Sequence, residues 1–196
     1  MRELECKILD VKKEASVNWL KRYYHNCGML PPEKVFHGIM YVKIFVDVNS
    51  GQFVRIRELK DQRHNTSKVE VTVKQDIPRS MKPILPDGVK MLNEHNCTVE
   101  KMTDAISLFE GLGFTPIEEF WKERESWVRD GLRYEYDRFL NFEDSRTWLE
   151  IEAEDMESLE FGVKAVGYTM NDISAVTTRQ LYEEVCRGIE KDQAPE

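Results

Sequence analysis

Short stretches in which apolar and polar residues alternate make up most of the chain. This period-two pattern is typical of strands that have one face in the core. It predicts eight strands, at residues 3–9, 40–47, 52–58, 68–75, 96–101, 120–128, 132–139 and 147–154. Asn49-Ser50-Gly51 and Asp130-Gly131 are typical turn sequences between neighbouring strands. We therefore expect a mainly antiparallel sheet.

A repeat of apolar positions every three to four residues predicts four helices, at residues 14–27, 103–112, 156–166 and 178–189. Gly113 and Gly167 follow two of these segments, at the position where a glycine often ends a helix. Together the elements predict an α+β fold in which helices flank one antiparallel sheet. The length of 196 residues fits a single domain over residues 1–190, and we expect residues 191–196 to form a disordered tail.

The polar faces of the predicted strands carry like charges in pairs, two positions apart. Acidic pairs stand on the first and last strands and basic pairs on two strands between them: Glu3 and Glu5, Glu150 and Glu152, Arg55 and Arg57, and Lys122 and Arg124. A sheet with one dry face and one solvated face also alternates in this way. Like charges on one strand face repel each other, however, so their segregation by sign favours a binding site. Closing the sheet into an eight-stranded β-barrel would place these charges inside.

The residue types in these pairs suggest a ligand class. Carboxylate pairs suit Mg²⁺ or Mn²⁺, because both ions prefer oxygen ligands. Arginine side chains bind phosphate oxygens in a bidentate geometry, and lysines add point charges. A triphosphate together with divalent cations would therefore balance the charges of such an interior.

Composition narrows the remaining possibilities. The formal net charge of −8 makes the chain a poor candidate for tight binding of duplex nucleic acid. The sequence has neither an apolar run long enough to span a membrane nor the apolar core of a signal peptide, so we expect a cytoplasmic protein. Its cysteines form no CxxC pair and its histidines show no zinc-binding spacing, which favours reduced thiols over a disulfide or zinc site.

The same charged strands resemble, in order, the motifs of the CYTH superfamily, also called triphosphate tunnel metalloenzymes. The resemblance spans residue 3 to about residue 185 and rests on seven segments: Glu3-Leu4-Glu5-Cys6-Lys7 (the ExExK motif), Phe53–Arg57 (LRIR), Thr72–Lys74 (the lysine strand), Gly111–Phe114 (LGF), Trp121–Arg124 (KxR), Tyr136–Arg138 (LD) and Leu149–Glu152 (EIE). Residues 96–100 stand where the family has RxExE, and they lack one arginine and one carboxylate of that motif.

The resemblance implies an eight-stranded tunnel with flanking helices that binds a triphosphate and Mg²⁺ or Mn²⁺. The metal ligands that it implies are Glu3, Glu5, Glu100, Asp137, Glu150 and Glu152. The phosphate-binding residues are Lys7, Arg55, Arg57, Lys74, Lys122 and Arg124. The catalytic residues among them are Glu5, Lys7, Arg57 and Asp137.

Three functions fit this reading. The first is metal-dependent hydrolysis of inorganic triphosphate, thiamine triphosphate or a nucleoside triphosphate. The second is cyclisation of ATP to cyclic AMP and pyrophosphate, as in the class IV adenylate cyclases of this family. The third is non-catalytic binding of a nucleotide or polyphosphate, which Thr98 motivates because it replaces a carboxylate. In each case we expect a small-molecule partner, no membrane, and a monomer or homodimer.

Overall fold

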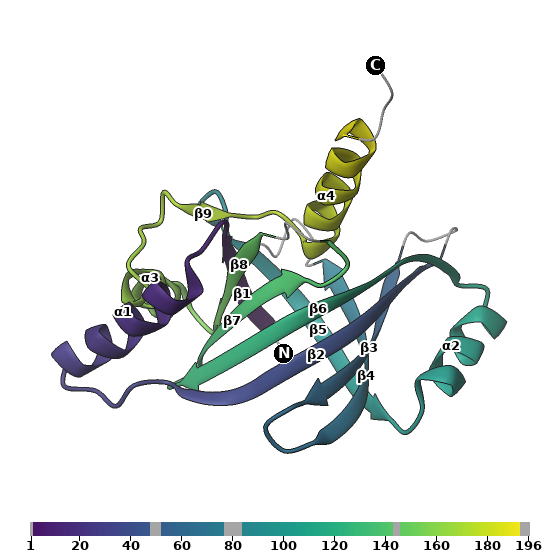
Figure 1. Ribbon diagram of the computed structural model, residues 1–196, viewed down its shortest axis with the longest axis horizontal. Helices are drawn as coiled ribbons and strands as arrows, with labels where there is room; N and C mark the ends of the chain where they lie inside the picture. Colours follow the sequence, from purple (N-terminus) through teal and green to yellow (C-terminus); the bar gives the residue numbers. More distant parts are fainter. Residues whose placement is uncertain (1, 48–51, 77–83, 143–145, 193–196) are drawn as a thin grey trace.

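The computed structural model describes residues 2–47, 52–76, 84–142 and 146–192 (Figure 1). Its nine strands in this part of the chain are β1 (Arg2–Ile8), β2 (Glu33–Val46), β3 (Phe53–Asp61), β4 (Thr66–Asp76), β5 (Lys90–Val99), β6 (Thr115–Arg129), β7 (Leu132–Phe139), β8 (Thr147–Ala153) and β9 (Ile173–Ser174). The four helices are α1 (Lys13–Asn26), α2 (Met102–Gly111), α3 (Met156–Ala165) and α4 (Thr178–Asp192). The predicted α+β class is therefore confirmed.

All nine strands belong to one strongly curled sheet, which Figure 1 shows wrapped around an interior. The strand order is β5-β4-β3-β2-β6-β7-β8-β1-β9, and the registers of neighbouring strands are antiparallel. An additional antiparallel pairing aligns Arg2–Glu5 of β1 with Lys90–Asn93 of β5. Strands from near the two ends of the order are therefore hydrogen-bonded to each other.

The apolar side chains of the strands face outward and are buried under the helices. Helices α1 and α3 lie together over β1, β7 and β8, where Leu4, Cys6, Leu149 and Ile151 are buried. Helix α2 packs against β3, in an apolar cluster that also contains Val69 and Val71 of β4. Because side chains on a strand alternate between faces, the charged neighbours of these apolar residues must point to the interior. In the part of the chain that the structure describes, no helix is long and apolar enough to cross a membrane.

A third apolar cluster lies at one end of the interior. It contains Met40, Phe120, Phe139 and Trp148 from the strands, and Leu181 from α4 completes it. Helix α4 rises away from the sheet at this end (Figure 1). The inner surface is therefore divided into an aromatic end next to α4 and a charged middle.

Several element boundaries differ from the sequence-based prediction. Strand β7 was predicted residue for residue, whereas β2, β5 and β6 begin five to seven residues before the predicted positions. In β2 a register shift between Lys34 and Phe36 interrupts the period-two pattern near the start of the strand. The two-residue strand β9 was not predicted. It is too short to carry a periodic signal.

The structure describes one of the two predicted turns and the first residues of the predicted tail. Asp130-Gly131 joins β6 to β7 with both residues at positive φ, as expected for a tight hairpin. Helix α4 continues to Asp192, so residues 191 and 192, which were predicted to belong to a disordered tail, are helical. Residues 193–196 and the predicted turn at residues 49–51 lie outside the described residues.

One glycine in β2 supports a close approach between β2 and β3. A Cβ atom built on Gly38 would lie 1.9 Å from the main-chain oxygen of Lys60. We expect Gly38→Ala to lower the free energy of unfolding by about 1–3 kcal/mol, because the backbone must shift to admit the methyl group. Urea denaturation measures this change. Gly111→Ala is the control, since a Cβ there meets nothing within 4 Å. An equal loss of stability in both variants would contradict the prediction.

Candidate active site

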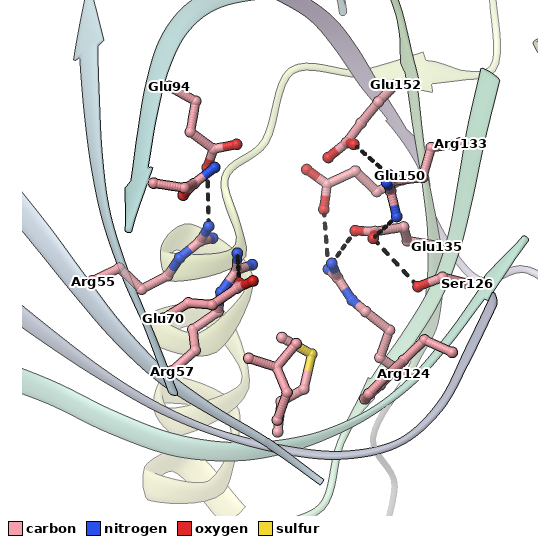
Figure 2. Close-up of a pocket in the computed structure, with 14 residues that line it drawn as sticks. Arg55, Arg57, Glu70, Glu94, Arg124, Ser126, Arg133, Glu135, Glu150 and Glu152 are labelled. Carbon is pink, nitrogen blue, oxygen red and sulfur yellow. Dashed lines mark hydrogen bonds and ion pairs between the residues drawn. The ribbon is translucent and has the colours of Figure 1, made fainter. Parts of the chain in front are cut away.

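Charged side chains line the inner face of the curled sheet around two adjoining cavities. The smaller cavity has a volume of about 240 Å³, and Figure 2 shows the side chains around it. The larger cavity has a volume of about 630 Å³ and extends to the first turn of α4. Arg55, Arg57 and Glu150 line both cavities, so one ligand could occupy both.

Three carboxylates from β1 and β8 form an acidic corner on one wall. Glu5 lies opposite Glu152 in the strand register, and one oxygen from each of Glu5, Glu150 and Glu152 lies within 4.8 Å of the other two. Glu5 and Glu150 are buried. Buried like charges at this separation need positive charge beside them. This donor set of oxygens alone is chemically suited to Mg²⁺ or Mn²⁺.

Two lysines already stand beside the acidic corner. The Nζ atom of Lys7 lies 2.9 Å from an oxygen of Glu150, and Nζ of Lys90 lies 3.9 Å from an oxygen of Glu5. Burial alone would lower the pKa of Lys7, but the carboxylates of Glu150 and Glu5 outweigh burial and raise it. Lys7 therefore remains charged at neutral pH, next to the position that a divalent ion would take.

Two arginines from β3 face the acidic corner from the opposite wall (Figure 2). The Nη2 atom of Arg55 lies 3.1 Å from Glu94, and that of Arg57 lies 2.9 Å from Glu70. The Nε atoms of both arginines are buried, with no hydrogen-bond partner in the described part of the chain. Burial, reinforced by the nearby Arg55 and Arg124, lowers the pKa of Arg57 to about 10. Arg55 and Arg57 line both cavities, and an anion bound there would relieve their mutual repulsion.

A second buried cluster forms where β6 meets β7. Asp137 accepts hydrogen bonds from Lys122 Nζ at 2.8 Å and from Arg124 Nε at 2.6 Å. Burial, together with the Arg124 charge, lowers the pKa of Lys122 to about 8. Arg124 also contacts Glu135, and its Nη2 atom lies 3.6 Å from Glu150. Arg124 and Lys122 therefore continue the row of cations that begins with Arg55 and Arg57 on β3 and ends at the acidic corner.

The structure brings most of the predicted site residues together. The side chains that line one or both cavities are Glu5, Lys7, Arg55, Arg57, Lys122, Arg124, Glu150 and Glu152. Asp137 lies behind them, bonded to Lys122 and Arg124, and does not belong to the group of three carboxylates. The side chains of Glu3 and Lys74 lie outside the described part of the structure.

The placement of Glu100 in this site is wrong. Glu100 follows the last residue of β5, is exposed, and lines neither of the two cavities. Strand β5 runs from Lys90 to Val99, so Glu100 lies past its end. The inward-facing positions of the strand begin earlier in the sequence than the prediction placed them. Glu94 and Asn96 line the smaller cavity instead, and Lys90 lines the larger one.

Sequence reasoning missed Lys90 and Glu94 as site residues. Both lie before the strand that was predicted at residues 96–101, because residues 89–95 show little alternation of apolar and polar side chains. The turn sequence Asp87-Gly88, immediately before β5, was the available signal for a strand start. The smaller cavity is also lined by Glu70, Arg133 and Glu135, which were not among the predicted site residues. Their roles depend on partners that only the strand pairing reveals.

Comparisons with known proteins agree on the fold. No protein-family model and no curated protein matches this sequence. A solved structure from Pyrococcus horikoshii OT3 superposes with a TM-score of 0.67 at 17% identity, covering 93% of this chain and 99% of that one. A candidate adenylate cyclase from Vibrio parahaemolyticus gives 0.66 at 16% identity, covering 92% and 97%. A candidate adenylyl cyclase from Hippeastrum, described as having a dominant triphosphatase activity, gives 0.57 at 17%, covering 93% and 96%. At these identities the likeness is one of fold.

Proposed function

We propose that this chain, which has a CYTH-type fold, hydrolyses a triphosphate with the help of a divalent cation, inside a tunnel closed by β1 to β8. The observation that carries the proposal is the arrangement of opposite charges across the two adjoining cavities. Glu5, Glu150 and Glu152 converge on one wall, and Arg55 and Arg57 face them from the other. A phosphate chain with a cation on one side and arginines on the other would satisfy both walls.

The side chains divide the work of binding. The guanidinium groups of Arg55 and Arg57, which line both cavities, would bind phosphate oxygens. Lys7 and Lys122, both buried, would add positive charge along the phosphate chain. Glu5, Glu150 and Glu152 would hold Mg²⁺ or Mn²⁺. The cation would act as a Lewis acid on phosphate oxygens.

Hydrolysis needs little further chemistry from the protein. A water oxygen attacks the terminal phosphorus in line, the bond from that phosphorus to its bridging oxygen breaks, and the diphosphate product leaves with the electron pair. The water releases its proton to solvent or to a carboxylate of the site. Arg57 and Arg124 line the same cavity and would stabilise charge on the equatorial oxygens in the transition state. No side-chain nucleophile is required.

Cyclisation of ATP is the second candidate, because the fold is shared with the candidate adenylate cyclase from Vibrio parahaemolyticus. In that reaction the ribose 3′-hydroxyl replaces water, attacks the phosphorus nearest the ribose, and releases pyrophosphate. Hydrolysis releases inorganic phosphate instead. The triphosphatase activity described for the Hippeastrum protein supports hydrolysis as the first choice.

Removal of divalent cations is expected to abolish turnover. Purified protein should release phosphate from at least one of inorganic triphosphate, ATP and thiamine triphosphate in the presence of Mg²⁺ or Mn²⁺. Excess EDTA should reduce the rate to background, and added metal should restore it, because the acidic corner cannot carry its charge alone beside a polyanion. Phosphate and cyclic nucleotide are quantified in parallel.

Three other outcomes of this assay would contradict the proposal, and two of them would indicate a different function. Cyclic AMP with pyrophosphate as the main products would favour the cyclase. Tight binding of a triphosphate in calorimetry without turnover in any metal would favour a binding protein. An EDTA-resistant hydrolysis would contradict the role proposed for the acidic corner.

A further inference from the structure

Cations of the protein's own chain already contact the acidic corner. Nitrogen atoms of Lys7 and Arg124 lie 2.9 Å and 3.6 Å from oxygens of Glu150. The Nε atom of Arg133 lies 3.3 Å from an oxygen of Glu152. A divalent cation bound to the same carboxylates would lie close to these positive groups and would be repelled by them. Metal binding is therefore most favourable if one of the chain's own cations withdraws.

Arg133 is the cation best placed to withdraw. Its side chain is 45% exposed, whereas those of Lys7 and Arg124 are only 3% and 7% exposed. The side chain of Lys90, beside Glu5, is 20% exposed. A buried cation that leaves its carboxylate must find another partner inside the protein, because an unpaired buried charge is costly. A half-exposed guanidinium group can be hydrated by solvent instead.

The strand pairing determines where the Arg133 side chain lies and where it can go. Arg133 stands opposite Glu152 in the register of β7 and β8, so both side chains lie on the same face of the sheet and line the smaller cavity (Figure 2). The Nη1 atom of Arg133 also lies 3.8 Å from an oxygen of Glu135, two positions along β7. The guanidinium group therefore has a second carboxylate within reach when it leaves Glu152.

We propose, on the basis of the metal-dependent function above, that Arg133 is a displaceable counter-ion of the acidic corner. Without metal, its guanidinium group neutralises Glu152. When Mg²⁺ or Mn²⁺ binds to the corner, the guanidinium group moves away from Glu152 toward Glu135 and solvent. Arg133 is a positioning residue, because it acts through Glu152 and sets the metal concentration at which the site fills.

This role predicts the sign of a mutational effect. Loss of the Arg133 charge leaves Glu152 without this counter-ion only while no metal is bound, since the metal neutralises the carboxylate in the filled site. The substitution therefore raises the free energy of the metal-free protein more than that of the metal-bound protein. Metal affinity should rise, which is opposite to the effect of removing a metal ligand.

Calorimetric titration of the purified protein with MnCl₂, without any triphosphate, tests the proposal. Arg133→Gln is expected to bind Mn²⁺ about 5-fold more tightly than the wild type, the change in an equilibrium that follows from the loss of one partly exposed ion pair. Arg133→Lys, which retains the charge, should have nearly the affinity of the wild type. The matched control is Arg138→Gln, also on β7, where the arginine is 53% exposed, is paired with Glu123 and lines neither cavity. Its affinity should equal that of the wild type.

The outcomes separate this inference from the proposed function. If Arg133→Gln has the wild-type circular dichroism and melting temperature but binds Mn²⁺ no more tightly, the inference is wrong, and metal-dependent hydrolysis can still stand. An equal rise in Arg138→Gln would also overturn it, because the cause would then be the net charge of the protein. The expected affinities without hydrolysis of any triphosphate would overturn the proposed function alone. Absence of Mn²⁺ binding in the wild type would overturn both.

Discussion

Asp137→Asn is expected to reduce the free energy of unfolding by about 3–5 kcal/mol, the typical cost of removing one partner from a buried ion pair. Asp137 is fully buried and neutralises Lys122 and Arg124, which are themselves buried. An asparagine keeps the size of the side chain but removes the negative charge, so both cations lose a counter-ion with which they are in direct contact. Urea denaturation at pH 7 measures the change.

The pH dependence of the stability difference between wild type and Asp137→Asn provides a second measurement. Burial alone would raise the pKa of Asp137, but Arg124 and Lys122 lower it below its ordinary value. A carboxyl group with a lowered pKa contributes stability above its unfolded pKa of about 4, and that contribution disappears as the pH falls through the folded pKa. The difference between wild type and Asp137→Asn should therefore be largest near neutral pH and shrink in acid.

The control for this variant is Asp104→Asn, in which the replaced carboxylate is exposed on α2. Its expected effect is less than about 1 kcal/mol, the usual contribution of an acidic residue in the first turn of a helix. If Asp137→Asn cost no more than Asp104→Asn at pH 7, the charges of Lys122 and Arg124 would have to be neutralised by other groups, such as Glu135 and Glu150.

Glu5→Gln is expected to lower kcat/KM for triphosphate hydrolysis by at least about 100-fold, with a parallel loss of metal affinity. Glu5 supplies one of the three carboxylates of the acidic corner. The substitution preserves shape and removes one charge, so it acts on the cation more than on the fold. Binding of Mn²⁺ by calorimetry reports on the corner even without substrate.

Glu154→Gln is the matched control, because Glu154 lies two residues past Glu152, just after the end of β8, and is exposed. Its kinetics and Mn²⁺ affinity should equal those of the wild type. If Glu5→Gln kept both turnover and Mn²⁺ affinity, the acidic corner would not be the metal site.

The sequence predicted the site best where the strand pattern was regular. On β1, β3 and β8 the charged residues alternate with apolar ones, and an apolar residue fixes which way its neighbour points. The pairs Glu5 and Lys7, and Arg55 and Arg57, were therefore placed correctly on the inner face. Neighbours across strands could not be deduced in this way, since strand order and register depend on the whole sheet.

The error at Glu100 has a physical explanation. The prediction aligned a family motif with the polar segment at residues 96–100, whereas β5 begins at Lys90 and ends at Val99. Strand β5 has few apolar residues on its outer face, so the sequence lacks the period-two signal that marked the other strands. The pairing of β5 with both β4 and β1 fixes its position instead. Those contacts are remote in sequence and leave no local pattern.

The pairing of β1 with β8 has a consequence for how the molecule reaches its native state. Lys7 and Glu150 are joined by an ion pair although nearly the whole domain separates them in the chain. Folding rates fall as contacting residues become more distant in sequence, because the intervening chain must be ordered first. During synthesis on the ribosome, the hairpins formed by β2 to β7 would emerge and pair before β8 is available. Catalytic competence should therefore arise late and all at once, and not gradually as the polypeptide lengthens.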